Sequence, residues 1–547
     1  MRYFLIVCLL SYAIEGMGQW SSDSLTLLQE RLSFWNEETP GASLQIVRDG
    51  IPLFEQAFGM SDLEHAEPNH LETLFEAGSV SKQFTAAGVL RLIQKGKLGL
   101  EDDVRKYIPE LPDYGSPIQV YHLLTHTSGI KDWGTVVEMG GWPRTTRVYQ
   151  QAHVYATICR QKTLNFKPGT AFAYSNSNHN LMVLLIERIS GLPFDVYTRQ
   201  EIFEPAGMKH TSWRMDFRDP VPNRSIAYQT KGQAWSQFMP FENTYGHAAL
   251  LTTTGDLIAW NAWVNGQHWG PEFERLRLLP YTLENGQQTE YTCGALFVRN
   301  IGGTQEICHT GSTAGYRSWL AYYPEYKLSV AYLSNDASVP SIALARLVSD
   351  FFIGAHPQKL PMFYNPEASG TRDVEKAGLY KQVDGPQVLE WVLQEDSLYL
   401  RVDPQWNGMY NDPWKTGQRT YSFHDELLEV SSPEGKVMYQ QVEYLNWKDE
   451  RLEDLPGRYY SEEAGGQVII TREGHAPFCI LHFEDGRSLR FMEGYVQDGQ
   501  IFLSDGAGLM LGLTLDSSEQ ITGFSANLSQ QRYALSRADN LWFERKK

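Results

Sequence analysis

Strand-like and helix-like hydrophobic patterns alternate along the first 350 residues of the chain. Two short strand patterns lie within residues 43–58 and surround Arg48-Asp49-Gly50, a sequence typical of a hairpin turn. Helical patterns dominate residues 79–207. Strand patterns return at 291–299, 304–309, 316–323 and 328–333, and a helical pattern follows at 342–352. Because strands lie at both ends and helices between them, we predict one α+β domain whose sheet is completed by its terminal strands.

The pattern changes after residue 354. Residues 354–372 carry Pro, Gly and Asn and lose their hydrophobic period, which predicts a linker. The rest reads as short strands with turns such as Asp485-Gly486. A weak repeat begins at Gly378-Leu379-Tyr380 and again at Gly457-Arg458-Tyr459, so we expect two small barrels or two halves of one. The predicted segments are a signal peptide (1–18), the α+β domain (19–355), a linker (356–372) and two β-rich repeats (373–449 and 450–547).

The N-terminus has the pattern of a secretory signal peptide. Arg2 precedes a short apolar run, and Gly16-Met17-Gly18 offers a small-x-small cleavage site. The run is too short to span a bilayer, and no later segment reaches that length. We therefore expect an exported protein, periplasmic or secreted, without a membrane span. The alternative interpretation is a buried first strand or helix.

Length and charge narrow the class of protein. A chain of 547 residues is too long for one ordinary domain, and 42% apolar and 20% charged residues are typical of a globular protein. The net charge of −18 argues against nucleic acid or an anionic membrane surface as a partner. Oligomeric state is left open.

Four cysteines would remain after removal of the signal peptide: Cys159, Cys293, Cys308 and Cys479. Cys293 and Cys308 flank a predicted hairpin at Ile301-Gly302-Gly303 and could face each other across two strands. The sequence leaves open whether these two cysteines form a disulfide or remain free thiols. No Cys/His cluster has metal-ligand spacing, so we expect no metal and no cofactor.

The first candidate for chemistry is the serine–lysine pair Ser79 and Lys82. Residues three apart on a helix share one face, which is the shortest way to place an amine beside a hydroxyl nucleophile. The same spacing recurs at Ser128 and Lys131. A mostly apolar helical pattern follows Ser79 and ends near Gly96, whereas no such pattern follows Ser128. We therefore place the first pair at the start of a buried helix and interpret the second as a turn.

Two further motifs could complete a serine hydrolase site. Tyr174-Ser175-Asn176 precedes a predicted helix at 181–189, and His309-Thr310-Gly311-Ser312 ends a predicted strand. Each motif is weak alone, because Tyr174 could be a buried core tyrosine and His309 a polar residue at a strand end. Tyr444-Leu445-Asn446 repeats the Tyr-x-Asn form in the β-rich region.

Together and in order, these motifs resemble the serine β-lactamase and penicillin-binding protein family. The nearest part is its class C β-lactamase, D-alanyl-D-alanine carboxypeptidase and esterase branch. The resemblance covers about residues 25–352 and extends to the sequences at 123–130, 168–169, 253–257 and 311–316. It implies a β-lactamase/transpeptidase-like α+β domain, with an antiparallel sheet and a helical domain. All-β, barrel-like C-terminal domains, lipocalin-like in style, would follow.

The resemblance implies an acyl-enzyme mechanism. Ser79 would be the acylated nucleophile, and Lys82 and Tyr174 would be its proton-transfer partners. Lysine and tyrosine both have ordinary pKa values near 10, and burial or a neighbouring charge can lower either. The two groups would titrate as a coupled pair, so the sequence leaves open which of them is the base.

The same resemblance implies a substrate-binding set. The backbone N–H groups of Ser79 and Ser312 would form the oxyanion hole. Asn176 would hold the substrate's amide carbonyl, and the strand would align the substrate. The predicted substrate-binding residues are Asn176, His309, Thr310 and Gly311.

One position departs from the β-lactamase pattern. That pattern has Lys-Thr-Gly at the third motif, where this chain has His309-Thr310-Gly311. A histidine with an ordinary pKa near 6.5 is mostly neutral at pH 7, which weakens the case for a carboxylate-bearing β-lactam and favours esters, amides or D-amino-acid peptides. We expect activity on a carboxylate-bearing substrate to fall as pH rises through the titration of His309, and a flat profile from pH 5 to 8 would contradict that role. Arg317 could supply the missing charge or be an ordinary strand arginine.

Three function classes remain open at this stage. The preferred class is a serine hydrolase that acts on small-molecule or peptide substrates, a peptidase or esterase before a β-lactamase. The others are a non-catalytic protein that binds cell-wall fragments and a partner-binding C-terminal region carried by a hydrolase. Trp133, Trp142 and Trp213 could line a pocket or belong to the core.

Overall fold

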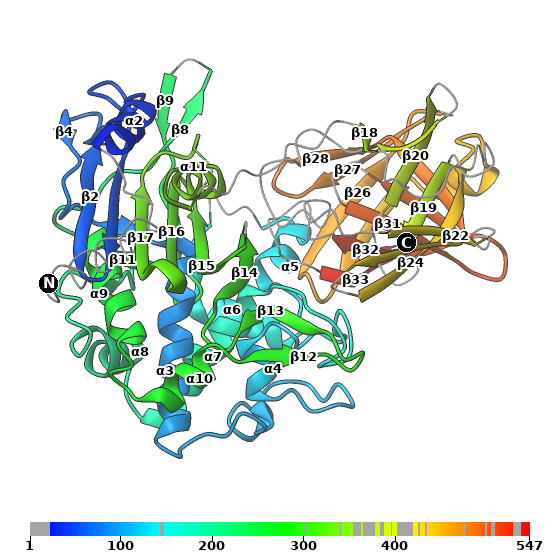
Figure 1. Cartoon of the computed structure of the whole chain (residues 1–547). Helices are drawn as coiled ribbons and strands as arrows, with labels where there is room; N and C mark the ends of the chain where they lie inside the picture. Colours follow the sequence, from blue (N-terminus) through cyan, green and yellow to red (C-terminus); the bar gives the residue numbers. More distant parts are fainter. Residues whose placement is uncertain are drawn as a thin grey trace, which may run out of the picture.

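An eight-stranded antiparallel sheet, built from both ends of the first 350 residues, forms the centre of the larger domain (Figure 1). Its order is β12-β13-β14-β15-β16-β17-β1-β2, so the N-terminal hairpin completes a sheet made mostly of later strands. The pairing Ala42↔Ser334 joins the two sequence ends. The predicted α+β domain is confirmed. The strands are β1 (Ala42–Arg48), β2 (Ile51–Phe58), β12 (Pro280–Thr282), β13 (Gln288–Thr292), β14 (Phe297–Ile301), β15 (Thr304–Thr313), β16 (Tyr316–Tyr323) and β17 (Leu328–Ser334).

The computed structural model describes residues 22–142, 147–232, 234–301, 303–339, 341–353, 363–364, 378–382, 388–394, 397–401, 420–424, 427–432, 435–474, 476–497, 500–504, 509–528 and 538–546. The predicted signal peptide and most of the predicted linker lie outside these residues. Among the described helices, none is long and apolar enough to cross a membrane.

Helices cover this sheet and build a lower lobe around α3, which is buried along most of its length (Figure 1). α9 packs on β1 and β17, and α11 packs on β15 and β16. The helices and helical turns are α2 (Ser22–Leu32), η1 (Gly78–Ser81), α3 (Lys82–Gln94), η2 (Val104–Lys106), α4 (Val120–Leu124), α5 (Trp133–Met139), α6 (Gln151–Cys159), α7 (Asn176–Ser190), α8 (Phe194–Thr198), η3 (Arg199–Phe203), α9 (Thr254–Asn265), α10 (Pro271–Arg277), η4 (Pro324–Tyr326) and α11 (Ser341–Ile353).

The larger domain also contains short strands outside the eight-stranded sheet. They form small sheets away from the eight-stranded one, among them β5-β11-β7 directly before η1. These strands are β3 (Met60–Asp62), β4 (Glu67–Pro68), β5 (Phe75–Glu76), β6 (Tyr149–Gln150), β7 (Ser212–Trp213), β8 (Tyr228–Lys231), β9 (Ala234–Gln237), β10 (Glu242–Asn243) and β11 (Leu250–Thr252).

The strand expected to end at His309 is β15, which continues to Thr313, so the motif at 309–312 lies inside the strand. Two further predicted boundaries are wrong. The single strand expected at 291–299 is two strands, because the chain turns at 293–296 with Ala295 at a φ of 56°. The helix expected to begin at 181 is α7, which begins at Asn176 after an extended Ser175. The second difference matters because it puts Asn176 in the first turn of a helix.

The C-terminal region is a nearly closed, barrel-like all-β domain made of one sixteen-stranded sheet. The first part of β24 pairs with β19 and β23, and its last two residues pair with β29. One continuous sheet favours two halves of one structure over two separate barrels, and the boundary at 449/450 stays a prediction.

The strands of this domain, with one helical turn, are β18 (Phe363–Tyr364), β19 (Gly378–Gln382), β20 (Val388–Gln394), β21 (Ser397–Arg401), β22 (Thr420–His424), β23 (Leu427–Ser432), β24 (Gly435–Tyr444), η8 (Glu450–Asp454), β25 (Gly457–Ser461), β26 (Gly466–Thr471), β27 (Cys479–Phe483), β28 (Ser488–Phe491), β29 (Glu493–Gln497), β30 (Gln500–Ser504), β31 (Leu509–Leu515), β32 (Ile521–Leu528) and β33 (Ala538–Lys546).

Cys293 and Cys308 are both described and are not disulfide-bonded. The register of β14 and β15 explains this, because Phe297, not Cys293, lies opposite Cys308. The Cys308 thiol instead donates to a carboxylate oxygen of Glu306 at 3.2 Å.

Candidate active site

Ser79 lies in η1, a short 3₁₀ turn between the small strand β5 and the long helix α3. Gly78 adopts a φ of 49°, and this left-handed residue lets the chain reverse directly before the serine. Ser79 is partly exposed, whereas its neighbours Gly78 and Val80 are buried. The serine therefore sits at the solvent-facing end of a buried helix, as the sequence predicted.

Lys82 begins α3 and is completely buried. Its Nζ lies 3.0 Å from Ser79 Oγ and donates to the backbone oxygen of His247 at 2.7 Å. Burial lowers the pKa of Lys82 to about 7, although the negative charge of Asp132 opposes that shift. At neutral pH the lysine is therefore present both as a cation and as a neutral amine beside the serine hydroxyl.

Tyr174 lies beside Lys82. Lys82 Nζ is 4.9 Å from the centre of the Tyr174 ring, and the tyrosine side chain is buried. The rings of His126 and Tyr291 pack against it, with centroids 4.3 and 5.9 Å away. The structure thus brings together the three residues predicted to perform the chemistry.

His309 is buried on β15 and faces this aromatic cluster rather than solvent. Its Nδ1 lies 2.5 Å from the Thr310 oxygen, which must accept, so Nδ1 carries the proton. Nε2 is then an acceptor for the hydroxyls of Tyr174 at 3.5 Å and Tyr291 at 3.3 Å. Burial, with the Lys82 cation, lowers the pKa of His309 to about 3.

The pH dependence expected from an ordinary histidine is therefore wrong. With a pKa of about 3, His309 stays neutral throughout pH 5 to 8 and does not titrate there. Neutral His309 does not offer a substrate carboxylate the charge that a lysine would. The Arg317 guanidinium donates to the backbone oxygens of Ala314, Tyr316 and Ala337, and its role toward a substrate carboxylate stays a prediction.

Two glycines let β15 approach the serine. A Cβ built on Gly311 would lie 2.2 Å from the Ala77 oxygen and 3.0 Å from the Ser79 nitrogen. A Cβ built on Gly78 would lie 2.7 Å from the Ser312 nitrogen. The backbone nitrogens of Ser79 and Ser312 thus each lie beside a position where only glycine fits.

β15 also runs past the end of its neighbour. The pairing of β14 with β15 ends at Phe297↔Cys308, so among the described strands none pairs with residues 309–313 on that side. Thr310 is partly exposed and Ser312 is exposed along this stretch. An extended peptide could add to such an edge through backbone hydrogen bonds.

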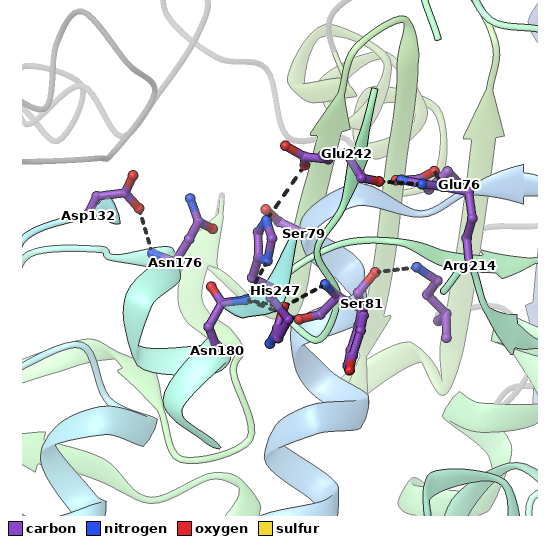
Figure 2. A network of polar contacts seen from close by, with 12 residues as sticks. Glu76, Ser79, Ser81, Asp132, Asn176, Asn180, Arg214, Glu242 and His247 are labelled. Atoms are coloured by element: carbon purple, nitrogen blue, oxygen red, sulfur yellow. Dashed lines mark hydrogen bonds and ion pairs between the residues drawn. The ribbon is translucent and has the colours of Figure 1, made fainter. Parts of the chain in front are cut away.

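Asn176 is partly exposed and starts α7. Its backbone N–H donates to a carboxylate oxygen of Asp132 at 2.7 Å, as Figure 2 shows. The other oxygen of Asp132 caps α5 by accepting from the Thr135 backbone at 3.1 Å. One buried carboxylate therefore holds the starts of two helices beside the serine.

The rival serine–lysine copy is engaged elsewhere. Ser128 lies in a bend, and its hydroxyl donates to the Asn178 side chain at 2.7 Å. Lys131 Nζ lies 2.8 Å from a carboxylate oxygen of Glu463, in the C-terminal domain. The interpretation of this copy as a turn is confirmed.

Sequence reasoning missed Asp132, Glu242 and His247. Asp132 directly precedes the helical pattern of α5, so its capping role could have been found from the sequence. The His247 ring lies between the Asn180 amide at 3.2 Å and a Glu242 carboxylate oxygen at 3.9 Å (Figure 2). A buried ion pair of Glu76 and Arg214 belongs to the same polar network (Figure 2). No local signal marks these contacts, because they join distant segments.

The three tryptophans resemble core residues more than pocket walls. Trp133 and Trp213 are buried in the main hydrophobic cluster, and Trp142 packs at its margin against Tyr149. Trp133 is the one nearest the site, with its ring 5.8 Å from that of His247.

Comparison with known proteins agrees with this geometry. A family model described as Beta-lactamase matches residues 27–350, more than half of the chain. The chain therefore belongs to the beta-lactamase family, and it is a serine hydrolase of that family.

Several curated relatives are aminopeptidases. The chain is 27% identical over 369 residues to a D-aminopeptidase of Gluconobacter oxydans, across 67% of this chain and 65% of that protein. It is 25% identical over 475 residues to a D-aminopeptidase of Brucella anthropi, across 83% and 85%. It is also 27% identical over 383 residues to penicillin-binding protein 4* of Bacillus subtilis, across 65% and 82%.

Solved structures share the fold. An octameric penicillin-binding protein homologue from Pyrococcus abyssi superposes with a TM-score of 0.54 at 22% identity, over 88% of this chain and 97% of that one. A D-amino acid amidase from Ochrobactrum anthropi gives a TM-score of 0.50 at 18% identity, over 61% and 97%.

Proposed function

We propose that this chain is an exported hydrolase that forms an acyl-enzyme at Ser79 with amides, peptides or esters of D-amino acids. The observation that carries the proposal is the contact of Ser79 Oγ with the buried Lys82 Nζ at 3.0 Å. Lowering a lysine pKa from 10.5 to about 7 reduces the cost of a neutral amine at pH 7 by about 5 kcal/mol.

In the proposed acylation step, neutral Lys82 accepts the Ser79 proton as Oγ bonds to the substrate's carbonyl carbon. The carbonyl electrons move to oxygen, which the backbone N–H groups of Ser79 and Ser312 stabilise. The carbonyl then re-forms, the C–N or C–O bond breaks, and the leaving amine or alcohol takes the proton. In this proposal Tyr174 passes that proton, and Asn176 holds the substrate's amide.

Water completes the proposed cycle. It attacks the Ser79 ester while Lys82 takes a proton, and the proton returns to Ser79 Oγ as the acid leaves. Each group ends in its starting state, so the cycle needs no co-reactant other than water.

The proposed substrate class rests on two observations. Neutral, buried His309 supports substrates that need no fixed cation at this strand. Relatives named D-aminopeptidase support D-amino-acid amides and peptides. The second candidate substrate is a β-lactam, and a relative named as a penicillin-binding protein supports it.

A substrate panel tests the proposal. D-amino-acid amides, D-Ala-D-Ala, nitrophenyl esters and a chromogenic cephalosporin would be compared by turnover and by the intact mass of the adduct. A fluorophosphonate probe should label the wild type and Ser128→Ala but not Ser79→Ala. Ser128→Ala is the matched control because it removes the serine of the second copy. Labelling of Ser79→Ala would contradict the nucleophile, and no labelling of any protein would favour a binding protein.

Export is tested separately. Residues 1–18 carry the signal-like pattern, so N-terminal sequencing of protein from a secreting host should find a chain that starts after Gly18. An intact N-terminus starting at Met1 would contradict export by this route.

A further inference from the structure

The barrel-like domain contacts the larger domain directly beside the candidate site. The contact is made by the turn between β25 and β26. A Cβ built on Gly466 would lie 1.8 Å from the Gly140 oxygen, and one built on Gly140 would lie 2.3 Å from the Ala464 oxygen. The two backbones therefore touch without side chains between them, which fixes this turn closely on the end of α5.

A buried ion pair crosses the same interface. Lys131 Nζ and Glu463 Oε2 are 2.8 Å apart, with side chains 0% and 7% exposed. Glu463 Oε1 accepts from the Lys162 backbone at 2.8 Å, and Lys131 also donates to Thr163 Oγ1 at 2.7 Å. Burial lowers the pKa of Lys131, and Glu463 and Asp539, both in the barrel, oppose that shift. The barrel thus supplies the carboxylate that pairs with this buried lysine.

Lys131 belongs to the segment that holds the start of α7. Its backbone oxygen accepts from Ser177 Oγ at 2.7 Å, and Ser177 Oγ accepts in turn from the Trp133 backbone at 2.9 Å. The next residue, Asp132, accepts from the Asn176 backbone at 2.7 Å (Figure 2). Asp132 is also the charge that raises the pKa of Lys82. Residues 131–133 therefore hold Asn176 in position and supply a negative charge that acts on Lys82.

α5 ties the same segment to the barrel core. Trp133 at its start belongs to the main hydrophobic cluster, whereas Val136 and Met139 belong to the cluster of the barrel. Near its end, Glu138 pairs with Arg487 of the barrel at 2.8 Å. The helix has only seven residues, so it cannot shift at one end without moving at the other.

We propose that Glu463 is a positioning residue for the hydrolase, which acts through Lys131 and Asp132 on Asn176 and Lys82. The proposal rests on the function proposed above, and it makes the barrel part of the catalytic apparatus rather than an appended module. Glu463→Gln leaves Lys131 buried without its carboxylate. The segment then rearranges, Asn176 loses its fixed place, and the opposing charge at Lys82 weakens.

The substitution Glu463→Gln should change both the rate and its pH dependence. Glu463→Gln should lower kcat/KM on the best panel substrate by tenfold or more, and the midpoint of its pH profile should move below that of the wild type. The direction follows because Asp132 raises the pKa of Lys82, so weakening its influence lowers that pKa. Glu463→Asp keeps the charge and should recover part of the rate and of the midpoint.

Glu462→Gln is the matched control. Glu462 is adjacent in the same turn and pairs with Lys162, but those side chains are 70% and 61% exposed. An exposed pair contributes little, so rate and midpoint should match the wild type within twofold and experimental error. Thermal melts of all variants set the assay temperature well below unfolding, which separates positioning from loss of folded protein.

Hydrogen exchange gives a second readout that does not depend on turnover. Peptides covering the start of α7 should exchange faster in Glu463→Gln than in Glu462→Gln or the wild type. Unchanged exchange there, or an unchanged pH midpoint in an active, folded Glu463→Gln protein, would overturn the inference. A wild type inert on every substrate would instead reject the proposed function, and the exchange data would still decide the role of Glu463.

Discussion

At the scale of single residues, enclosure changes the two groups on which the chemistry depends. Lys82 and His309 are both buried near Tyr174, yet burial acts on them with different consequences. It brings the lysine into the neutral pH range and takes the histidine out of it, because both groups lose solvation for their charged forms. The group that titrates near neutral pH is therefore Lys82, and not His309.

The pH profile of the wild type should reflect this lysine. If neutral Lys82 is the base, kcat/KM rises with pH and reaches half its maximum near pH 7, where the pKa of the buried amine lies. Lys82→Arg stays protonated and should lose at least about a hundredfold in kcat/KM. Steady-state kinetics from pH 5 to 9 measure both effects.

His309→Gln is the control for the same experiment. The substitution keeps a neutral polar side chain, so the midpoint should stay where the wild type has it, whatever happens to the rate. A midpoint that moved with His309→Gln and was unaffected by changes around Lys82 would show that the histidine titrates after all.

At the scale of elements, β15 and η1 define the site by how closely they approach. The Ser318 hydroxyl donates to the Ala77 oxygen at 2.6 Å, and Ser341 donates to the Gly311 oxygen at 3.1 Å. The first bond fastens β16, the neighbour of β15, to the residue before η1, and the second fastens the start of α11 to β15. Gly311 is required because the approach leaves no room for a Cβ.

Gly311→Ala should therefore abolish most activity. Its Cβ would meet the Ser318 hydroxyl at 2.1 Å and the backbone oxygen of Ala77 at 2.2 Å, so the strand must move away from Ser79. We expect a loss of kcat/KM of at least about a hundredfold, on the order of one lost oxyanion donor. Fluorophosphonate labelling rates and thermal melts measure the effect.

Gly255→Ala is the matched glycine control. Gly255 lies in the first turns of α9, and the nearest atom to its Cβ would be 3.6 Å away. Alanine should be tolerated there or stabilise the helix by about 0.5–1 kcal/mol. Equal losses of kcat/KM in both variants would mean that the close packing at Gly311 is not the cause of the effect.

At the scale of the whole molecule, the two domains share a helix and a buried ion pair. The barrel cluster includes Val136 and Met139 from the larger domain, so the core of the barrel is completed by the larger domain. The C-terminal region is therefore better described as part of the enzyme than as a separate module. The alternative in which it is only a partner-binding unit predicts that its removal leaves turnover unchanged.

Met139→Ala tests this shared core. Met139 is 2% exposed, so its truncation should cost about 2–5 kcal/mol and lower the unfolding temperature. Calorimetry should show one transition that shifts as a whole, because the cavity lies between the domains. Met492→Ala, at a methionine of the barrel that is 63% exposed, should leave the transition in place. Two separate transitions, with only one shifted, would contradict the shared core.

Much of the architecture could be predicted because its signals are local. The hairpin at Asp49-Gly50 and the helix after Ser79 follow from turn residues and hydrophobic period, and both are present. The break at Ala295 and the early start of α7 at Asn176 could not, since tertiary contacts decide them. Asp132 determines the latter by capping a helix that begins 44 residues later.

The sequence by itself determined the serine–lysine spacing, the order of the motifs and the fold class, because these depend on neighbouring residues and on hydrophobic period. Only the tertiary structure decided which distant groups each lysine contacts and what state Lys82 has. Lys82 donates to a backbone oxygen 165 residues away, whereas Lys131 pairs with a carboxylate 332 residues away. Burial and long-range charge set a pKa, and neither can be read from adjacent residues.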